Sequence, residues 1–315
     1  MAGELSDKPD NSPFFFAGKL IRYNKGKGIN EMDKIKIRAY AKINLTLDIL
    51  DKLPNGYHKI NSIFQAINLY DTLLIFKTKD GFCLDSSVNC HDEDNLITKA
   101  WEKMEDFISS KARNKVLLSE AKEVLIKRSL PCRIHLSKNI PEGAGLGGGS
   151  SDAAATLIGL NNLFKLNLNL KQLSRIGAQI GSDVSFFIYN IGTASINGIG
   201  EKIKVSDRKP SNFYVLAKPN KGISTSEIYS LFDQHNKSKS FFELAQKICP
   251  SIKTIYSYFS LISNDYAMSG TGPTIFAGFN SYEEALKAKN NFKDETFKGN
   301  FYICKPSKET YKIVF

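Results

Sequence analysis

The sequence lacks any long apolar run. No stretch approaches the roughly 18 consecutive apolar residues of a membrane-spanning helix. The N-terminus also lacks a cationic segment followed by an apolar core and a small-residue cleavage site. Hydrophobic residues make up 42% of the 315 residues and charged residues 24%, which is ordinary for a soluble globular protein. We therefore expect a soluble, cytoplasmic protein that is long enough for two domains.

Cysteine and histidine are too few and too scattered to predict a metal centre. The five cysteines form no C-x-x-C pair, and their odd number and wide spacing argue against a disulfide framework. No two of the four histidines lie three or four residues apart, as two ligands on one helix would. The sequence therefore predicts buried, reduced thiols and no structural metal.

Positive charge is in excess but is not concentrated. The formal net charge of +11 favours an acidic or phosphorylated partner. The lysines lie in short segments such as KTKD and NKSKS, with acidic residues between them. This dispersal favours a solvated surface and a small phosphate-bearing ligand over a nucleic-acid-binding face.

The hydrophobic patterns predict a mixed α+β chain in two domains. A polar stretch at 1–31 predicts a loosely packed extension. Alternating apolar positions predict an antiparallel hairpin over about 35–78 and further strands at 132–140, 213–218, 272–279 and 301–306. Helical spacing predicts helices at 93–108, 116–128, 151–164, 170–181, 225–233, 241–262 and 281–292. A linker at 206–212 predicts an N-terminal domain of residues 32–208 and a C-terminal domain of residues 209–315.

The segment NIPEGAGLGGGSSDAAATL (139–157) places a glycine-rich loop directly before a predicted helix. Glycine lets another atom approach the backbone closely, and the first turn of a helix offers unpaired N–H groups and the positive end of its dipole. An anion is the natural occupant of such a place. The segment therefore predicts a phosphate-binding loop, with a flexible turn as the alternative.

Two common nucleotide motifs do not fit this loop. No lysine follows its last glycine, so it is not the G-x-x-x-x-G-K-[ST] loop. A G-x-G-x-x-G pattern runs through Gly143, Gly145 and Gly148, but the stretch FKLNLNLKQL about 20 residues later contains no acidic residue. The dinucleotide-binding interpretation is therefore not supported.

Three segments, spread along the chain, together suggest a family. These are AYAKINLTLDILDKLPNGYHKINSIFQAINLYD (39–71), IPEGAGLGGGSSDAAA (140–155) and MSGTGPTIFAGF (268–279). They resemble the N-terminal motif, the phosphate loop and the C-terminal glycine motif of the GHMP kinases, and the resemblance spans about residues 34–306. It implies a two-domain α+β GHMP kinase fold, with a ribosomal-protein-like N-terminal domain and a ferredoxin-like C-terminal domain.

The resemblance implies phosphoryl transfer from ATP, with Mg²⁺ as a cofactor, to the alcohol of a small molecule. Asp183 in IGSDVSFF matches the catalytic aspartate of the family, and Lys42 in YAKINL matches its catalytic lysine. A carboxylate can accept the proton of an alcohol, and a nearby ammonium would keep that carboxylate ionised. Without the resemblance, Asp183 would be interpreted as a helix N-cap and Lys42 as a surface lysine.

The resemblance places ATP across the glycine-rich loop. The expected contacts are Pro141, Glu142, Gly143, Ala144, Gly145, Leu146, Gly147, Gly148, Gly149, Ser150 and Ser151. Lys138 and Thr271 are further candidate phosphate contacts, with a solvated strand lysine as the alternative for Lys138. Ser151 is a candidate Mg²⁺ ligand or, equally, a cap of the following helix.

The turn NGYH (55–58) points to one branch of the family. By pattern alone it predicts a type I′ hairpin turn with an exposed aromatic residue. It also resembles the motif of GHMP kinases whose substrate carries a cytidine diphosphate group. The resemblance implies that Tyr57 and Tyr229 stack on the two faces of the base and that His58 hydrogen-bonds its edge. Asn44 and Thr225 are the expected polar contacts to the rest of the substrate.

Three other functions have weaker support. The substrate of a GHMP kinase of the homoserine or mevalonate type contains no nucleobase that could bind between two aromatic rings. A basic RNA-binding module would show strongly salt-dependent RNA affinity and no ATP turnover. A catalytically silent nucleotide sensor is disfavoured because Lys42 and Asp183 are both present. We expect a small-molecule kinase of isoprenoid precursor synthesis that needs no nucleic acid, membrane or obligate protein partner.

Overall fold

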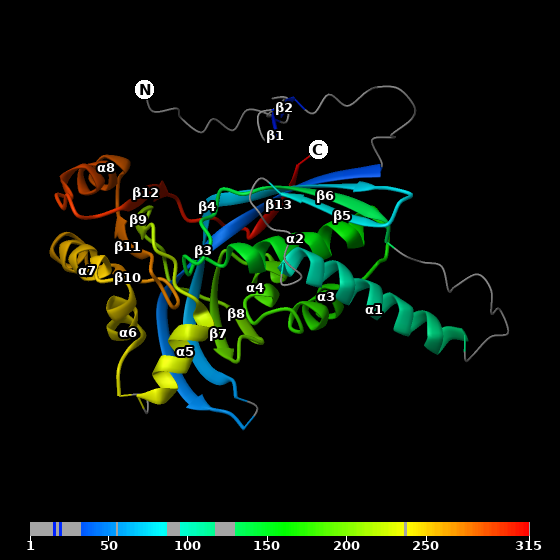
Figure 1. Cartoon of the computed structure of the whole chain (residues 1–315), viewed down its shortest axis with the longest axis horizontal. Helices are drawn as coiled ribbons and strands as arrows, with labels where there is room; N and C mark the ends of the chain where they lie inside the picture. Colours follow the sequence, from blue (N-terminus) through cyan, green and yellow to red (C-terminus); the bar gives the residue numbers. More distant parts are fainter. Residues whose placement is uncertain are drawn as a thin grey trace.

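The computed structural model describes residues 15–16, 19–20, 33–54, 56–86, 95–116, 130–235 and 238–314. Its elements form two lobes, each built on its own β-sheet (Figure 1). The expected extension at 1–31 lies outside the described residues, apart from the paired short strands β1 (Phe15–Phe16) and β2 (Lys19–Leu20). Most of the helix expected at 116–128 also lies outside them.

A long antiparallel hairpin organises the first lobe, as predicted. It consists of β3 (Lys34–Lys52) and β4 (His58–Lys77). One part of β4 pairs with β6 (Cys132–Ser137) and the part nearer the hairpin tip pairs with β7 (Thr193–Gly198). The sheet is completed by β5 (Phe82–Ser86), β8 (Lys202–Val205) and β13 (Tyr311–Val314).

Four helices accompany this sheet: α1 (Leu96–Val116), α2 (Gly148–Leu163), α3 (Leu170–Gly177) and α4 (Val184–Tyr189). Helix α2 is buried along most of its length because it packs on β3 and β4 and is contacted by the other three helices. Small residues permit this close packing, since a Cβ atom at Gly159 would lie 2.4 Å from Cδ1 of Ile75. The start of α2, which carries the glycine-rich loop, is therefore held firmly against the sheet.

The second lobe contains an antiparallel sheet in the order β10-β11-β9-β12. Its strands are β9 (Phe213–Pro219), β10 (Tyr266–Met268), β11 (Ile275–Phe279) and β12 (Gly299–Cys304). Helices α7 (Ser251–Ile262) and α8 (Tyr282–Asn291) pack on the sheet. Helix α6 (Phe241–Ile248) lies beside α7, and α5 (Thr225–Gln234) lies beside α6, toward the hairpin tip (Figure 1). The prediction of a single helix over 241–262 is wrong. The helix is interrupted at Pro250, because proline has no N–H to donate to a helical hydrogen bond.

The two lobes share a hydrophobic cluster next to the glycine-rich loop. Ile43 of β3 packs in one cluster with Tyr214 of β9 and Phe276 of β11, and Leu146 of the loop belongs to the same cluster. After β12 the chain returns to the first lobe, where β13 pairs antiparallel with β3. The division of the sequence at residue 209 stays a prediction, with β13 part of the first sheet.

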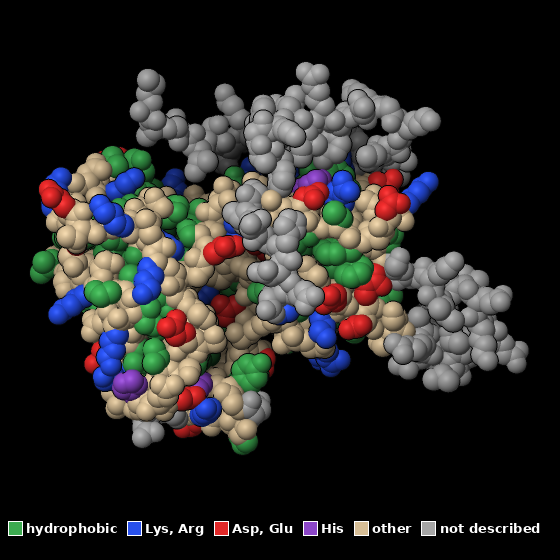
Figure 2. Space-filling view, in the orientation of Figure 1, with side chains coloured by type: hydrophobic (Ala, Val, Ile, Leu, Met, Phe, Trp, Pro, Cys, Tyr) green, Lys and Arg blue, Asp and Glu red, His purple; other side chains and the backbone are tan. Residues whose placement is uncertain are grey.

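Charges of both signs are mixed on the face of the molecule shown in Figure 2. Figure 2 shows lysine and arginine side chains spread over the visible face and interspersed with acidic ones, without a single basic stripe on that face. In the described part of the chain, no helix is both long and apolar enough to cross a membrane.

Candidate active site

The glycine-rich loop connects β6 to α2 through three left-handed glycines. The φ angles are 56° at Gly143, 73° at Gly145 and 70° at Gly147. Helix α2 starts at Gly148, so the predicted start at residue 151 is three residues late. Its N-cap, Gly147, has no side chain to cap the helix, and the first turn therefore begins with amides that no N-cap side chain occupies.

A cavity of about 450 Å³ lies between the two lobes, with this loop as one wall. It brings together Lys42, Asn44, Lys138, Asp183, Thr225, Tyr229, Thr271 and every residue from Pro141 to Ser150. The predicted residues Ser151, Tyr57 and His58 are not among those that line it. Its volume lies within the range of small-molecule sites.

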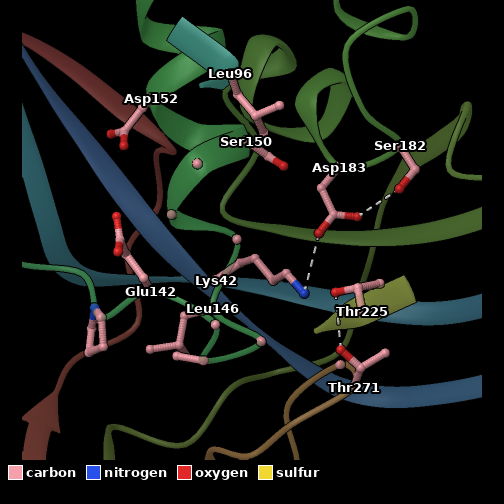
Figure 3. A pocket seen from close by; sticks show the side chains of 18 of the residues that line it. Lys42, Leu96, Glu142, Leu146, Ser150, Asp152, Ser182, Asp183, Thr225 and Thr271 are labelled. Carbon is pink, nitrogen blue, oxygen red and sulfur yellow. Dashed lines mark hydrogen bonds and ion pairs between the residues drawn. The ribbon is translucent and has the colours of Figure 1, made fainter. Parts of the chain in front are cut away.

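Lys42 and Asp183 form an ion pair inside this cavity (Figure 3). The Lys42 Nζ lies 3.4 Å from the Asp183 Oδ2. The lysine side chain is 5% exposed, whereas the aspartate side chain is 24% exposed. The ammonium is buried among a carboxylate, the Asn44 amide and the ring of Phe64, whose centroid lies 4.7 Å from Nζ. The pair thus presents a partly open carboxylate beside a fixed positive charge.

The structure does not support a capping role for the Asp183 side chain. Asp183 occupies the N-cap position of α4 but makes no side-chain cap hydrogen bond. Its Oδ1 instead accepts a hydrogen bond from Ser182 Oγ at 3.4 Å, and its Oδ2 faces Lys42. The carboxylate is thus turned toward the cavity rather than toward the helix amides, as Figure 3 shows.

Asn44 orients Lys42. Its Oδ1 accepts a hydrogen bond from Lys42 Nζ at 2.6 Å, and its Nδ2 donates to Ser62 Oγ at 3.0 Å. The Oγ of Ser269, before the C-terminal glycine turn, accepts from the backbone N–H of Asn44 at 3.3 Å and donates to the carbonyl oxygen of Gly145 at 2.9 Å. Because both ends of the Asn44 side chain are engaged, its first role is to position the lysine.

The close packing of the loop explains two of its glycines. A Cβ atom at Gly145 would lie 2.1 Å from the carbonyl oxygen of Ser269, which belongs to the second lobe. A Cβ atom at Gly147 would lie 3.1 Å from Cε of Lys42. Side chains at these positions would thus push the loop away from the C-terminal turn and from the lysine.

Lys138 lies between two buried carboxylates. Its Nζ is 2.5 Å from Asp71 Oδ2 and 2.9 Å from Asp152 Oδ2. Burial alone would lower the pKa of Lys138, but the charges of Asp152 and Asp71 outweigh it and raise that pKa. Asp71 also accepts hydrogen bonds from the amides of Asn139 and Ile140. The lysine therefore fixes the entrance to the loop, although it also lines the cavity.

Asp152 is the other acidic member of this network. Burial raises its pKa, the Lys138 charge opposes that rise, and the Asp71 charge adds to it. The Asp152 Oδ1 is buried and has no hydrogen-bond partner among the described residues. Asp152 and Glu142 both line the cavity, and Figure 3 shows their carboxylates on the same side of it.

Ser151 does not point into the cavity. It is buried, and its Oγ donates to the carbonyl oxygen of Tyr40 on β3 at 2.7 Å. Ser151 does not cap the helix, because the helix has already begun at Gly148. Its Mg²⁺ contact stays a prediction, which this orientation of the hydroxyl does not favour. The neighbouring Ser150 lines the cavity instead.

The predicted base-binding residues lie at different depths. Tyr57 is 59% exposed, whereas His58 is buried behind Tyr229 with its ring centroid 5.1 Å from that of the tyrosine. Burial, and secondarily the charge of Asp183, raises the pKa of Tyr229 to about 12. The His58 Nε2 lies 2.8 Å from Asp233 Oδ1. The structure therefore does not bring the His58 imidazole to the cavity wall.

Several contributing residues were missed from the sequence. Asp71 and Ser269 lie inside the family-like motifs, but nothing in their spacing shows that they anchor the loop. The spacing of Asp233, four residues after Tyr229 on one helix, could have suggested a shared face. Within the described residues, no group of three or more His, Cys, Asp or Glu side chains could hold a metal ion.

Comparison with known proteins places the chain among kinases. The family model of the GHMP kinases N terminal domain matches residues 95–190. A protein of Caldanaerobacter subterraneus named 4-diphosphocytidyl-2-C-methyl-D-erythritol kinase is 34% identical over 287 residues, which cover 82% of this chain and 93% of the relative. A protein of Clostridium tetani with the same name is 36% identical, over 86% of this chain and 99% of its own length.

Solved structures agree on the fold. A crystal structure of 4-(cytidine 5'-diphospho)-2C-methyl-D-erythritol kinase superposes with a TM-score of 0.65 at 22% identity, over 86% of this chain and all of the other. Homoserine kinase from Cytophaga hutchinsonii gives the same TM-score at 15% identity, over 91% of this chain and 99% of the other. These structures establish a two-lobed α+β architecture of the GHMP kinase type, as the resemblance implied.

Proposed function

The chain belongs to the GHMP kinases, and we propose that it transfers the γ-phosphoryl group of ATP to the 2-hydroxyl of 4-diphosphocytidyl-2-C-methyl-D-erythritol. This reaction is a step of the methylerythritol phosphate route to isoprenoid precursors. The observation that carries the proposal is the Lys42–Asp183 pair, which lies in one cavity with the amides that start α2.

Asp183 is the proposed general base. Its carboxylate is partly open to the cavity, so it can accept the proton of an alcohol that approaches a phosphate on the loop. The Lys42 ammonium stabilises negative charge that develops on the acceptor oxygen. Asn44 fixes the ammonium through a 2.6 Å hydrogen bond. Since the acceptor hydroxyl is tertiary and crowded, alignment matters at least as much as proton removal.

The start of α2 is the proposed phosphate site. Helix N-terminal amides and the helix dipole attract anions, and the left-handed glycines 143, 145 and 147 let phosphate oxygens approach the backbone. Gly270 and Thr271 line the cavity from the second lobe, so they would form the wall of the phosphate region opposite the glycine-rich loop. Lys138 would influence the phosphates by its charge, since its ammonium is already paired with two carboxylates.

Mg²⁺ is a further part of this proposal, because phosphoryl transfer from ATP uses metal-bound phosphates. Protein sites for Mg²⁺ often supply only one or two carboxylates, with phosphates and water completing the shell. The cavity offers the carboxylates of Glu142, Asp152 and Asp183 and the hydroxyl of Ser150, and Asp152 Oδ1 lacks a partner among the described residues. One of these carboxylates, together with the Ser150 hydroxyl and the ATP phosphates, would suffice to hold such an ion, which would neutralise phosphate charge when bound.

The cytidine group is the proposed basis of substrate selection. Tyr229 faces the cavity and Tyr57 is exposed at the hairpin tip, so a base bound between them would stack on both. Stacking on aromatic side chains contributes about 1–3 kcal/mol per base. Thr225, whose Oγ1 lies 3.2 Å from Thr271 Oγ1, is the proposed polar contact between base and phosphates.

We also propose that the protein works in the cytoplasm, where ATP and cytidine nucleotides are available.

A coupled assay of ADP release tests this function. The wild-type protein is given ATP and, in separate reactions, 4-diphosphocytidyl-2-C-methyl-D-erythritol, mevalonate or homoserine. We expect turnover with the cytidylyl substrate only. Turnover with mevalonate or homoserine alone would show that the substrate assignment is wrong, and salt-sensitive RNA binding without any turnover would favour the RNA-binding alternative.

A further inference from the structure

Asp233 joins the hairpin tip of the first lobe to α5 of the second. Lys52 and His58 are direct partners across the β3–β4 hairpin, and both reach this one carboxylate. The Lys52 Nζ lies 2.5 Å from Asp233 Oδ2, and the His58 Nε2 lies 2.8 Å from Asp233 Oδ1. The hydrogen bond from Lys52 and then that from His58 lower the pKa of Asp233, so the carboxylate is ionised at neutral pH.

The His58 imidazole is enclosed by α5. Its side chain is 2% exposed, and its ring lies 5.1 Å from Tyr229 and 5.8 Å from Phe232 between ring centroids. A carboxylate only accepts hydrogen bonds when ionised, so the Nε2 that faces Asp233 carries a hydrogen. Asp233 therefore sets the tautomer and the orientation of the His58 ring, against which the Tyr229 ring packs.

Helix α5 is held at both ends. Thr225, Tyr229 and Asp233 are spaced by four residues, so they share one face of the helix. Thr225 is in hydrogen-bond distance of Thr271 in the C-terminal glycine turn, and Asp233 holds the hairpin tip. Tyr229 lies between these two attachments, lines the cavity, and is backed by Phe241 at 4.9 Å between ring centroids. Its ring position therefore depends on where the two ends of α5 are fixed.

We propose that Asp233 is a positioning residue for the cytidylyl group of the substrate. Through His58 it fixes Tyr229, and through the hairpin tip it fixes Tyr57, so that the two rings stand at a spacing that accepts one base. This inference rests on the proposed function and assigns Asp233 no contact with the reacting atoms. The effect operates mainly through His58, because Lys52 is 43% exposed and surface ion pairs stabilise weakly.

Binding measurements on the full chain test this role. Asp233→Ala should raise the Kd for CDP about tenfold, which corresponds to about 1.4 kcal/mol, and should leave the Kd for the ATP analogue AMP-PNP within twofold of wild type. Asp233→Asn keeps an oxygen that can accept from His58, so its loss should be smaller, about threefold. In turnover the KM for the cytidylyl substrate should rise while kcat changes little. Unchanged CDP affinity in Asp233→Ala would overturn the proposal.

Glu227→Gln is the matched control, since it removes one negative charge from an exposed position of the same helix. It should leave both dissociation constants unchanged. A uniform loss of CDP and AMP-PNP affinity in the Asp233 variants would show a general structural role and would also overturn the proposal. If Asp233→Ala does not fold, Asp233→Asn carries the same comparison.

A spectroscopic readout separates tautomer control from simple stability. The ¹⁵N shifts of His58 in wild type should report the tautomer with hydrogen on Nε2, and Asp233→Ala should give a mixture of tautomers. An unchanged spectrum would contradict control by Asp233. The proposed function itself would be rejected if the wild-type protein neither binds CDP nor turns over the cytidylyl substrate. Wild-type activity combined with unaffected Asp233 variants would reject only the positioning role.

Discussion

At the residue scale, the proposed reaction depends on where the charges of Lys42 and Asp183 lie. Lys42 is a buried cation whose position is fixed by Asn44, by Asp183 and by the wall of the glycine-rich loop. Asp183 is the more open partner, so it is the one that an acceptor alcohol can reach. The family resemblance identified both residues, whereas the sequence alone would have assigned them a surface role and a capping role. Lys42 lies on β3 and Asp183 at the start of α4, and these segments are far apart in the sequence. The sequence pattern of each segment therefore gives no sign that the two side chains meet.

The substitution Asp183→Asn separates chemistry from binding. It keeps the shape of the side chain but removes the base, so we expect kcat to fall by about 10²–10⁴-fold. The Kd for AMP-PNP should stay within threefold of wild type because the start of α2 is untouched. Steady-state kinetics and isothermal titration provide the two values. A variant that retains more than a tenth of wild-type kcat would remove the general-base role.

Asp152 should make stability depend on pH. Burial raises its pKa in the folded state above the unfolded value of about 3.9. The folded state therefore holds this proton more tightly, and the free energy of unfolding falls as pH rises from about 4 up to the raised pKa. Asp152→Asn cannot ionise and should flatten that part of the profile, as measured by urea unfolding at several pH values. Parallel profiles for the two proteins would contradict the assigned shift.

At the scale of elements, the glycine-rich loop shows where sequence patterns succeed and fail. The pattern correctly predicted a helix after the loop, but not that it begins at Gly148, because glycine has a low helix propensity and the first two residues of the helix are glycines. The strands β5, β7, β8, β10 and β13 were not predicted either. They are short, at three to six residues each, and β5 and β13 also pair with strands that are distant in sequence. The long hairpin was predicted because its two strands are consecutive and strongly apolar.

Gly145→Ala tests the close approach of the loop to the second lobe. Alanine at a φ of 73° is strained, and its Cβ would meet the carbonyl oxygen of Ser269. Gly81→Ala is the matched control, with a φ of 82° and no atom within 4 Å of the added Cβ. We expect Gly145→Ala to lose about 1–3 kcal/mol more of the free energy of unfolding than the control, with a raised KM for ATP. Equal losses in urea unfolding would contradict the packing described.

At the scale of the whole molecule, the chain crosses between the lobes more than once. Residues that follow β12 return to the first sheet, where Thr310 donates its amide to Asn190 Oδ1 at 2.7 Å and its hydroxyl to Phe187 O at 2.6 Å. Strand β13 then pairs with β3, which also carries Lys42 and Asn44. A boundary in the linker at 206–212 was a reasonable expectation from composition, but composition contains no information about a returning strand. Strand β3, which carries Lys42, is therefore flanked by the returning C-terminal strand on one side and by β4 on the other.

Removal of residues 307–315 tests this support. The shortened chain loses β13 and exposes the edge of β3 at residues 36–39. We expect a lower thermal midpoint, by more than about 5 °C, because several hydrogen bonds and apolar contacts are lost together. Thermal unfolding followed by far-UV circular dichroism gives the midpoint. An unchanged midpoint would mean that the returning strand contributes little to the first lobe.

The most direct measurement of the central claim is a crystal structure of the protein with AMP-PNP and 4-diphosphocytidyl-2-C-methyl-D-erythritol bound together. The account predicts the triphosphate against residues 143–150, with the acceptor 2-hydroxyl between the γ-phosphate and the Asp183 carboxylate, and the cytosine ring against Tyr229. A triphosphate bound away from the loop, or an acceptor hydroxyl that does not reach Asp183, would contradict it.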